Sequence, residues 1–168
     1  MPIYFFDTSA LKHRYINTKP HAQRIGWLVS NAKCECYVAD WTVLEVASAL
    51  AGCCRDRRAG VNKFDSMDRL FFRDMASGRI KVRPTNSRDI LRARSLLRKG
   101  VMIHRRVDSG DALIAACCRD LALERRQRIT FYTSDWGLYT VLREIGAFTS
   151  VLKLRFVGAP KHGIPAET

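Results

Sequence analysis

Short apolar runs alternate with longer segments in which apolar residues recur at helical spacing. The runs have the length and the aromatic or β-branched content of buried strands, and the last one alternates apolar and basic side chains, as a strand with one wet face does. The expected strands cover residues 2–6, 36–39, 80–82, 129–133 and 151–156.

The intervening segments predict helices. These are a short helix from Ser9 and helices over residues 20–31, 41–57, 62–75, 86–99, 109–125 and 136–145. Because strands and helices alternate throughout, we expect a three-layer α/β/α fold around a central, mainly parallel sheet. Residues 1–157 would form a single domain, and residues 158–168, rich in glycine and proline, a loose tail.

Composition narrows the class of protein. The 168 residues suffice for one hydrophobic core, and 47% of them are hydrophobic. No apolar run is long enough to span a bilayer, and the N-terminus does not resemble a secretory signal, so we expect a cytoplasmic protein without membrane contact. The six cysteines lack the spacing of a zinc module and are expected to be reduced, small residues of the core.

Charge is the unusual property of this chain. It has 29 Lys and Arg against 16 Asp and Glu, a net charge of +13. Such an excess favours a polyanionic partner, and nucleic acid before membrane because no basic amphipathic anchor is present. A solvated basic surface adapted to the host cell is the alternative.

Four acidic residues border apolar blocks. Asp7 ends the first strand, Asp135 follows the fourth, and Glu45 and Asp111 lie in the first turns of apolar helices. Each could be a helix cap or a partner of a helix dipole. Carboxyl ends of parallel strands form binding sites, however, and one shared site explains all four more economically.

A shared acidic site has a chemical requirement. Converging carboxylates repel one another by several kcal/mol at an intermediate dielectric, about 4 kcal/mol at 4 Å. A cation between them removes the repulsion, and all-oxygen ligands select Mg²⁺ or Mn²⁺. An acidic, metal-binding pit in a basic surface is typical of a nuclease, since basic side chains hold the phosphate backbone.

The order of these motifs resembles the PIN-domain family of metal-dependent ribonucleases, and in size the VapC-type toxins of bacterial toxin–antitoxin pairs. The resemblance covers residues 2–156 and is carried by Asp7-Thr8-Ser9-Ala10-Leu11, by Glu45, by Asp111-Ala112-Leu113-Ile114-Ala115-Ala116 and by Thr133-Ser134-Asp135.

This resemblance implies roles for the matching residues. The catalytic quartet would be Asp7, Glu45, Asp111 and Asp135, with one or two Mg²⁺ or Mn²⁺ ions held mainly by the three aspartates. Glu45 would orient ligands or water, or complete a second metal site. The hydroxyls of Ser9 and Thr133 would bond a carboxylate or a metal-bound water. It further implies hydrolysis of RNA, a homodimer, and an antitoxin protein that blocks the site.

Several assignments stay open. Arg105 and Arg106 are candidates for contacts to the RNA backbone, with a solvated loop as the alternative. Asp108 is expected to cap the helix after it, and an auxiliary metal ligand is the alternative. Phe64, Phe71 and Phe72 are expected to be mostly core, with a dimer or antitoxin surface as the alternative.

The function also has competing readings. A housekeeping RNA-processing PIN nuclease, or a non-catalytic RNA-binding module on the same fold, would share most of these features. A phosphotransferase with Asp7 as nucleophile would need an aspartate where Ser9 stands, so the sequence argues against it.

Overall fold

The strands lie side by side in one fully parallel sheet. The computed structural model describes residues 1–16, 20–56, 58 and 60–158. Within these residues the strand order is β3-β2-β1-β4-β5, and each neighbouring pair is parallel. The strands are β1 (Ile3–Phe6), β2 (Glu35–Ala39), β3 (Lys81–Arg83), β4 (Ile129–Thr133) and β5 (Leu152–Phe156). The sequence prediction of these strands and of a parallel-centred sheet is confirmed.

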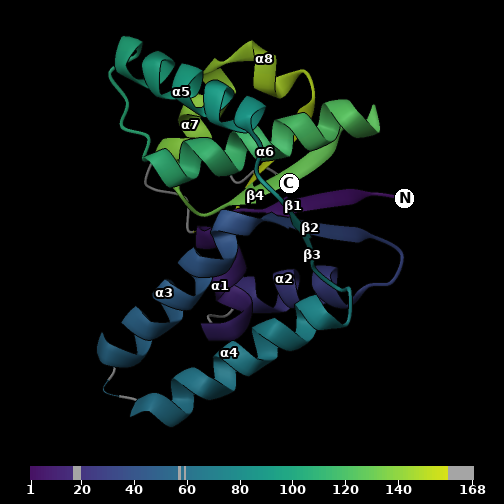
Figure 1. The fold of residues 1–168 in the computed structure, drawn as a ribbon, viewed down its shortest axis with the longest axis vertical. Coiled ribbons are helices and arrows are strands. Elements are labelled where there is room, and N and C mark those ends of the chain that lie inside the picture. The colour runs from purple at the N-terminus through teal and green to yellow at the C-terminus, as the bar shows by residue number, and fades with distance from the viewer. Residues whose placement is uncertain (17–19, 57, 59, 159–168) are drawn as a thin grey trace.

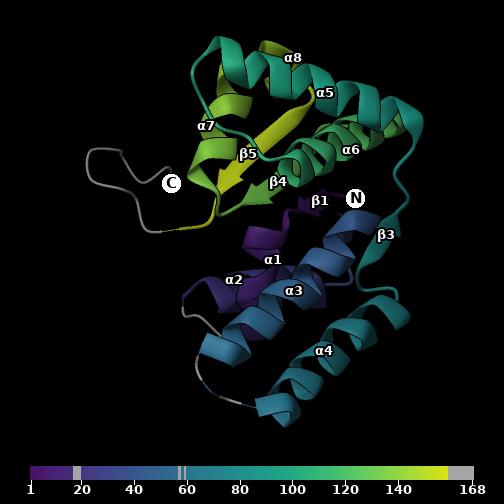
Figure 2. The same ribbon diagram turned by 60° about the vertical axis from the view of Figure 1, so that its left-hand side comes forward.

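Helices cover both faces of the sheet (Figures 1 and 2). One layer contains α1 (Thr8–Ile16), α2 (His21–Ser30), α3 (Asp40–Asp56) and α4 (Gly60–Ala76). The other contains α5 (Ser87–Met102), α6 (Ser109–Arg125), α7 (Trp136–Glu144) and α8 (Gly146–Thr149). The three-layer α/β/α architecture is therefore confirmed.

Two details of the helices differ from the sequence prediction. Helix α8 was missed because four residues are too few to establish a helical period. Helix α5 continues past Lys99 through Gly100, which we expected to open a loop. A Cβ at Gly100 would lie 3.0 Å from the Arg105 carbonyl oxygen, so this glycine lets the returning chain pack closely on the helix.

Alternate residues of the central strands fill two separate cores. Phe5 and Phe131 face the α5–α8 layer, whereas Phe6 and Tyr132 face the α1–α4 layer. All four side chains are buried, as expected of parallel strands covered on both faces. The small residues of α6 between Ala112 and Cys118 let that helix lie close to the sheet, and all but Leu113 are fully buried.

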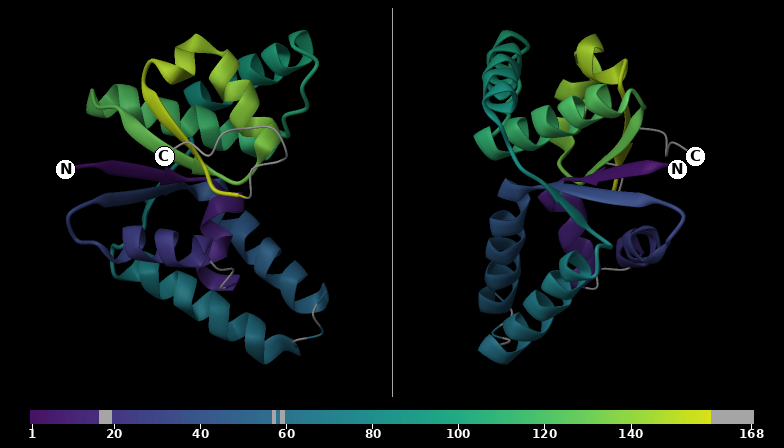
Figure 3. Two further views of the ribbon diagram at one scale, coloured as in Figure 1. Left: turned by 180° about the vertical axis from the view of Figure 1, so that it is seen from behind. Right: turned by 45° about the vertical axis from the view of Figure 1, so that its right-hand side comes forward.

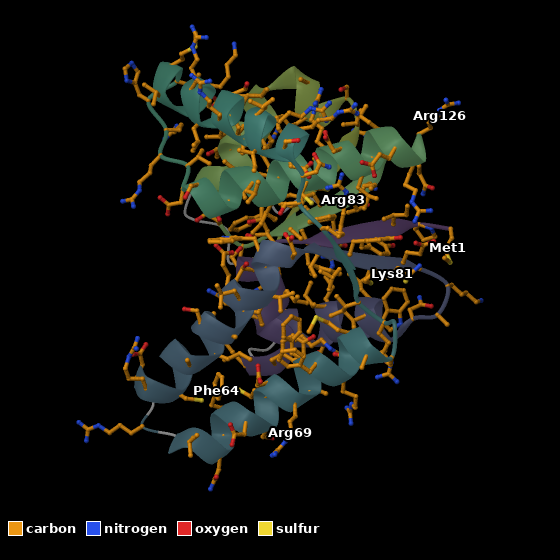
Figure 4. The ribbon with its side chains drawn as sticks, viewed as in Figure 1. Met1, Phe64, Arg69, Lys81, Arg83 and Arg126 are labelled. Atoms are coloured by element: carbon orange, nitrogen blue, oxygen red, sulfur yellow. The ribbon has the colours of Figure 1, made fainter. Side chains whose placement is uncertain are left out.

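A buried arginine connects the edge of the sheet to the α5–α8 layer. Arg83, at the end of β3, is only 7% exposed. Its Nη1 donates to Asp89 Oδ2 of α5 at 2.9 Å, and its Nη2 donates to Glu124 Oε1 of α6 at 2.7 Å. Figure 4 labels Arg83 beside α6 and Lys81 on the same edge strand, farther from α6. A buried charge needs such partners, so Arg83 fixes both helices to β3.

The aromatic stripe of α4 is only partly core. Phe71 is fully buried and Phe64 is half-buried, but Phe72 is 50% exposed. The expectation of a mostly buried stripe is thus correct for Phe71 and wrong for Phe72.

Two further expectations can be compared with the structure. All six cysteines are free thiols, and four of them are buried. No described helix is both long and apolar enough to cross a membrane. Of the expected tail, only Gly158 belongs to the described residues.

The strand order reverses beside β1. From this central strand the chain builds β2 and β3 on one side, then crosses to build β4 and β5 on the other. The carboxyl ends of β1 and β4 therefore form a switch point, where a crevice opens in parallel α/β sheets. Asp7 extends this pairing, since its N–H donates to the Tyr132 carbonyl oxygen at 2.9 Å. In Figure 1 these ends point to the left, where α3 and α6 begin.

Candidate active site

An acidic pocket of about 370 Å³ lies at this switch point, and all four predicted carboxylates line it. They come from four different segments: the ends of β1 and β4, the second turn of α3 and the first turn of α6. The lining residues are Asp7, Thr8, Ser9, Lys12, Glu45, Ser48, Ala49, Asp108, Asp111 and Asp135.

Asp7 is fully buried on the floor of the pocket. Its Oδ2 accepts hydrogen bonds from the hydroxyl of Ser9 and, at 2.8 Å, from that of Thr133. Its Oδ1 is buried without a hydrogen-bond partner. Burial raises the pKa of Asp7 and Glu45 adds to the rise, while the two hydroxyls oppose it. An unpartnered buried carboxylate oxygen is costly unless a ligand completes it.

Ser9 and Thr133 also join β1 to β4 through backbone contacts. The Ser9 oxygen accepts the N–H of Ser134 at 2.8 Å, and the Thr133 oxygen accepts that of Asp135 at 2.9 Å. Each hydroxyl thus donates to Asp7 and accepts from the neighbouring loop. The two residues fix the orientation of the Asp7 carboxylate.

Asp135 is both a helix cap and a pocket residue. Its Oδ1 accepts the N–H of Leu138 at 2.7 Å, which caps α7. The same side chain lines the pocket. The capping interpretation of Asp135 is correct, and it does not compete with a place in the site.

Glu45 is held between two donors. Its Oε2 accepts from the Thr8 hydroxyl at 2.5 Å, and its Oε1 accepts from the Trp41 indole N–H at 2.9 Å. The first turn of α6 packs against this pair, because a Cβ on Gly110 would lie 2.3 Å from Glu45 Oε1 and 2.9 Å from Trp41 Nε1. Glycine at position 110 therefore lets Asp111, its neighbour, approach Glu45.

Asp111 shows the electrostatic strain of the cluster most clearly. Burial raises its pKa to about 7, and the negative charges of Asp7, Asp135, Glu45 and Asp108 add to the rise in that order. Like charges around a partly buried carboxyl disfavour its ionised form. The pocket therefore favours a bound cation or a proton.

Asp108 does not cap α6 as expected. It occupies the capping position, but its side chain makes no capping hydrogen bond. Instead it accepts from Arg106 Nε at 3.1 Å and lines the pocket. The carboxylate is paired with the rim arginine instead of the helix N–H groups, so the capping prediction is wrong.

The two candidate RNA-binding arginines lie in the loop before α6. Both are exposed, and neither lines the pocket. Arg106 is at the rim through its contact with Asp108. Nothing comparable places Arg105 at the site.

Sequence reasoning missed several pocket residues. Thr8 and Lys12 are four residues apart on α1, and Glu45 and Ala49 have the same spacing on α3. Residues at this spacing share a helix face, so helical periodicity starting from Thr8 and Glu45 could have found Lys12 and Ala49. Trp41, which contacts Glu45, lies four residues before it on α3, so the same spacing could have found it.

The donor set fits a hard divalent cation. The pocket offers carboxylate oxygens, which are the ligands that Mg²⁺ and Mn²⁺ prefer. Asp7 Oδ1, buried without a hydrogen-bond partner, could bind such a cation. Among the described residues, no three His, Cys, Asp or Glu side chains already have the spacing of a metal site. A cation would have to draw the carboxylates closer together, and it would relieve their repulsion.

The protein is thus an α/β protein with a fully parallel sheet, and its carboxylate site lies at the switch point of that sheet. The model of the PIN domain matches residues 4–142. The chain therefore belongs to the PIN-domain family, whose members are generally nucleases. No curated protein matched the chain.

Solved structures with the same fold come from toxin–antitoxin systems. VapBC-5 from Mycobacterium tuberculosis, a member of the VapBC family of toxin–antitoxin systems, has a TM-score of 0.60 at 15% identity, covering 94% of this chain and 100% of that one. VapBC2 from Rickettsia felis, bound to a promoter DNA fragment, has a TM-score of 0.58 at 12% identity, covering 90% of this chain and 98% of that one. DNA-bound VapBC from Salmonella typhimurium has a TM-score of 0.57 at 11% identity, covering 92% of this chain and 98% of that one. At these identities the likeness concerns the fold.

Proposed function

We propose that this protein is a metal-dependent endoribonuclease and the toxin of a type II toxin–antitoxin pair. The observation that carries the proposal is the convergence of Asp7, Glu45, Asp111 and Asp135 on one pocket at the switch point. Membership of a family of nucleases supports hydrolysis of a phosphodiester. The toxin assignment is supported by fold relatives that belong to toxin–antitoxin systems.

The residues of the pocket would divide the work. Asp7, Asp111 and Asp135 would hold Mg²⁺ or Mn²⁺, which when bound polarises the phosphate and activates a water molecule. Glu45, fixed by its two donors, would orient a ligand or that water. Ser9 and Thr133 would keep the Asp7 carboxylate in position.

A cation already present in the pocket complements this set. Lys12 is the one basic residue that lines the pocket within the described part of the chain. An ammonium group there can contact a phosphate oxygen of the substrate beside the acids. The net charge of +13 would draw RNA toward the acidic pocket from outside.

The partners follow from the same proposal. RNA would be the substrate, an antitoxin protein would block the pocket, and the protein would act as a homodimer in the cytoplasm. Arg106, at the rim, is a better candidate for the RNA backbone than Arg105.

The test combines cleavage with metal binding. Purified protein should cleave single-stranded RNA with Mg²⁺ or Mn²⁺, and Asp7→Asn or Asp111→Asn should abolish cleavage without unfolding the protein. Asp56→Asn is a matched control, because that carboxylate is 76% exposed and outside the pocket. Undiminished cleavage by either site variant would contradict the proposal.

Thermal unfolding separates the rival functions. Mn²⁺ at 100 times its Kd stabilises a binding-competent fold by about 2.7 kcal/mol, and Asp7→Asn should lose this effect. A protein that binds RNA without Mn²⁺ stabilisation or cleavage would be a non-catalytic binding module. Growth arrest on expression, relieved by the protein of the adjacent reading frame, would distinguish a toxin from a housekeeping nuclease.

A further inference from the structure

A second pocket, of about 230 Å³, lies along the outer strand β5 and is strongly basic. Four cationic side chains line it, Arg128, Arg143, Lys153 and Arg155, and none of its lining residues is acidic. The proposed catalytic role leaves this pocket unexplained. A concave site with such a surplus of positive charge is suited to an anion.

Three of the four cationic side chains have no carboxylate partner within the part of the chain that the structure describes. Among the described residues, no carboxylate forms an ion pair with Arg128, Lys153 or Arg155. Arg128 instead donates to the carbonyl oxygens of Thr149 and Leu152, at 3.1 and 3.4 Å. The guanidinium is therefore positioned without being neutralised, which differs from the carboxylate-paired Arg83.

The pocket is reached from the acidic site along two elements. In the sheet, Arg155 is level with Tyr132, just before the β4 end that leads to Asp135. Lys153 faces the same side about 7 Å farther back along β5. Along α7, Arg143 lies seven residues, about 10 Å, beyond Trp136. An extended strand of a few nucleotides can cover such distances.

Within the described residues, β5 is an edge strand of the sheet. It is the last strand in the sheet order and pairs only with β4 among the described strands. Figure 3 shows it on the side of the sheet away from β3. A chain that leaves the acidic pocket beside α7 can therefore follow the outside of β5.

We propose that the basic pocket of Arg128, Arg143, Lys153 and Arg155 binds the phosphate backbone of the RNA on one side of the scissile bond. This inference rests on the proposed ribonuclease function. It adds the path of the bound RNA, which would lie along β5. The contacts read phosphate, so the pocket strengthens binding without selecting a base sequence.

The experiment measures how RNA affinity depends on salt. The Asp7→Asn protein, in chelator, binds a labelled oligouridylate of about 20 nucleotides without cleaving it, and fluorescence anisotropy gives the Kd at several NaCl concentrations. Each phosphate contact to a single strand contributes about 0.7 to the slope of log K against log salt. Lys153→Ala/Arg155→Ala in that protein should lower the slope by about 1.4.

A matched control removes one lysine and one arginine elsewhere. Lys63 and Arg69 are exposed on α4, and Figure 4 shows Arg69 on this helix, across the sheet from α5–α8. Lys63→Ala/Arg69→Ala should leave the salt slope unchanged. An equal loss in both double variants would show a general charge effect and overturn the proposal, provided that both keep the parental Tm.

Two other results also decide the matter. An unchanged slope in Lys153→Ala/Arg155→Ala would mean that these charges only protect an open sheet edge from aggregation. A polyglutamate peptide serves as the probe for an acidic peptide. If Lys153→Ala/Arg155→Ala loses binding of this peptide but keeps RNA binding, the pocket binds an acidic peptide instead. Failure of the wild-type protein to cleave any RNA with Mg²⁺ or Mn²⁺ would refute the ribonuclease function itself, a result separate from the slope.

Discussion

Gly110→Ala tests whether the position of Glu45 matters for catalysis. The added methyl group would lie 2.3 Å from Glu45 Oε1, so that oxygen must move by about 1 Å to reach ordinary contact. The indole of Trp41, 2.9 Å away, hinders part of this movement. A misplacement of about 1 Å in a catalytic group can cost about 100-fold in rate.

Stability should respond differently from activity. Glu45 is a flexible, half-exposed side chain, so moving its carboxylate costs little free energy of folding. Alanine is also a better helix former than glycine by up to about 1 kcal/mol. We expect RNA cleavage to fall about 10- to 100-fold while the free energy of unfolding changes by less than about 1 kcal/mol.

The assay is kcat and KM for RNA cleavage, with urea unfolding of the same preparation. Gly52→Ala is the control, because it is also a helical glycine and its Cβ would meet only Arg55 at an ordinary 3.8 Å. It should keep full activity. Full activity in Gly110→Ala, or unfolding of that variant, would refute the reasoning.

Three further substitutions probe other parts of the structure. Trp41→Phe keeps an aromatic ring but removes the N–H that Glu45 accepts, so kcat should fall about 10-fold with an unchanged Tm; an unchanged kcat would argue against positioning. Arg83→Ala leaves Asp89 buried without its ion-pair partner and should lower the free energy of unfolding by about 3–5 kcal/mol in urea; a loss below 1 kcal/mol would contradict this. The pKa of Asp111 rises from 3.8 to about 7 on folding, so the metal-free protein should lose stability as pH rises from 4 to 7. Asp111→Asn should flatten that decline and raise the Tm at pH 8, by about 2–4 °C for each kcal/mol; a wild-type Tm independent of pH would oppose this.

The sequence predicted the parts of the site that depend on local pattern. Asp7 and Asp135 were recognisable because each interrupts an apolar strand, and parallel strands bring their carboxyl ends together. Glu45 and Asp111 stood out as acids inside apolar helices. The structure brings these four side chains to one pocket.

Contacts between distant segments were beyond such reasoning. The approach of Gly110 to Glu45 joins α6 to α3 across 65 positions, and no period in either helix encodes it. Asp108 has the sequence context of a cap, yet its carboxylate accepts from Arg106, two residues before it, and makes no capping hydrogen bond. The basic alternation of β5 was visible, but its pocket also needs Arg128 and Arg143 from other elements.

The central place of β1 in the sheet has a consequence for synthesis on the ribosome. Strand β1, the first of this sheet along the chain, pairs with β4, whose residues follow more than 120 positions later, and the last carboxylate of the pocket is Asp135. A nascent chain therefore has no complete acidic pocket until nearly the whole domain has left the exit tunnel. For a member of a family of nucleases, this order means that the acidic pocket cannot assemble before the segment that follows β4 has been made.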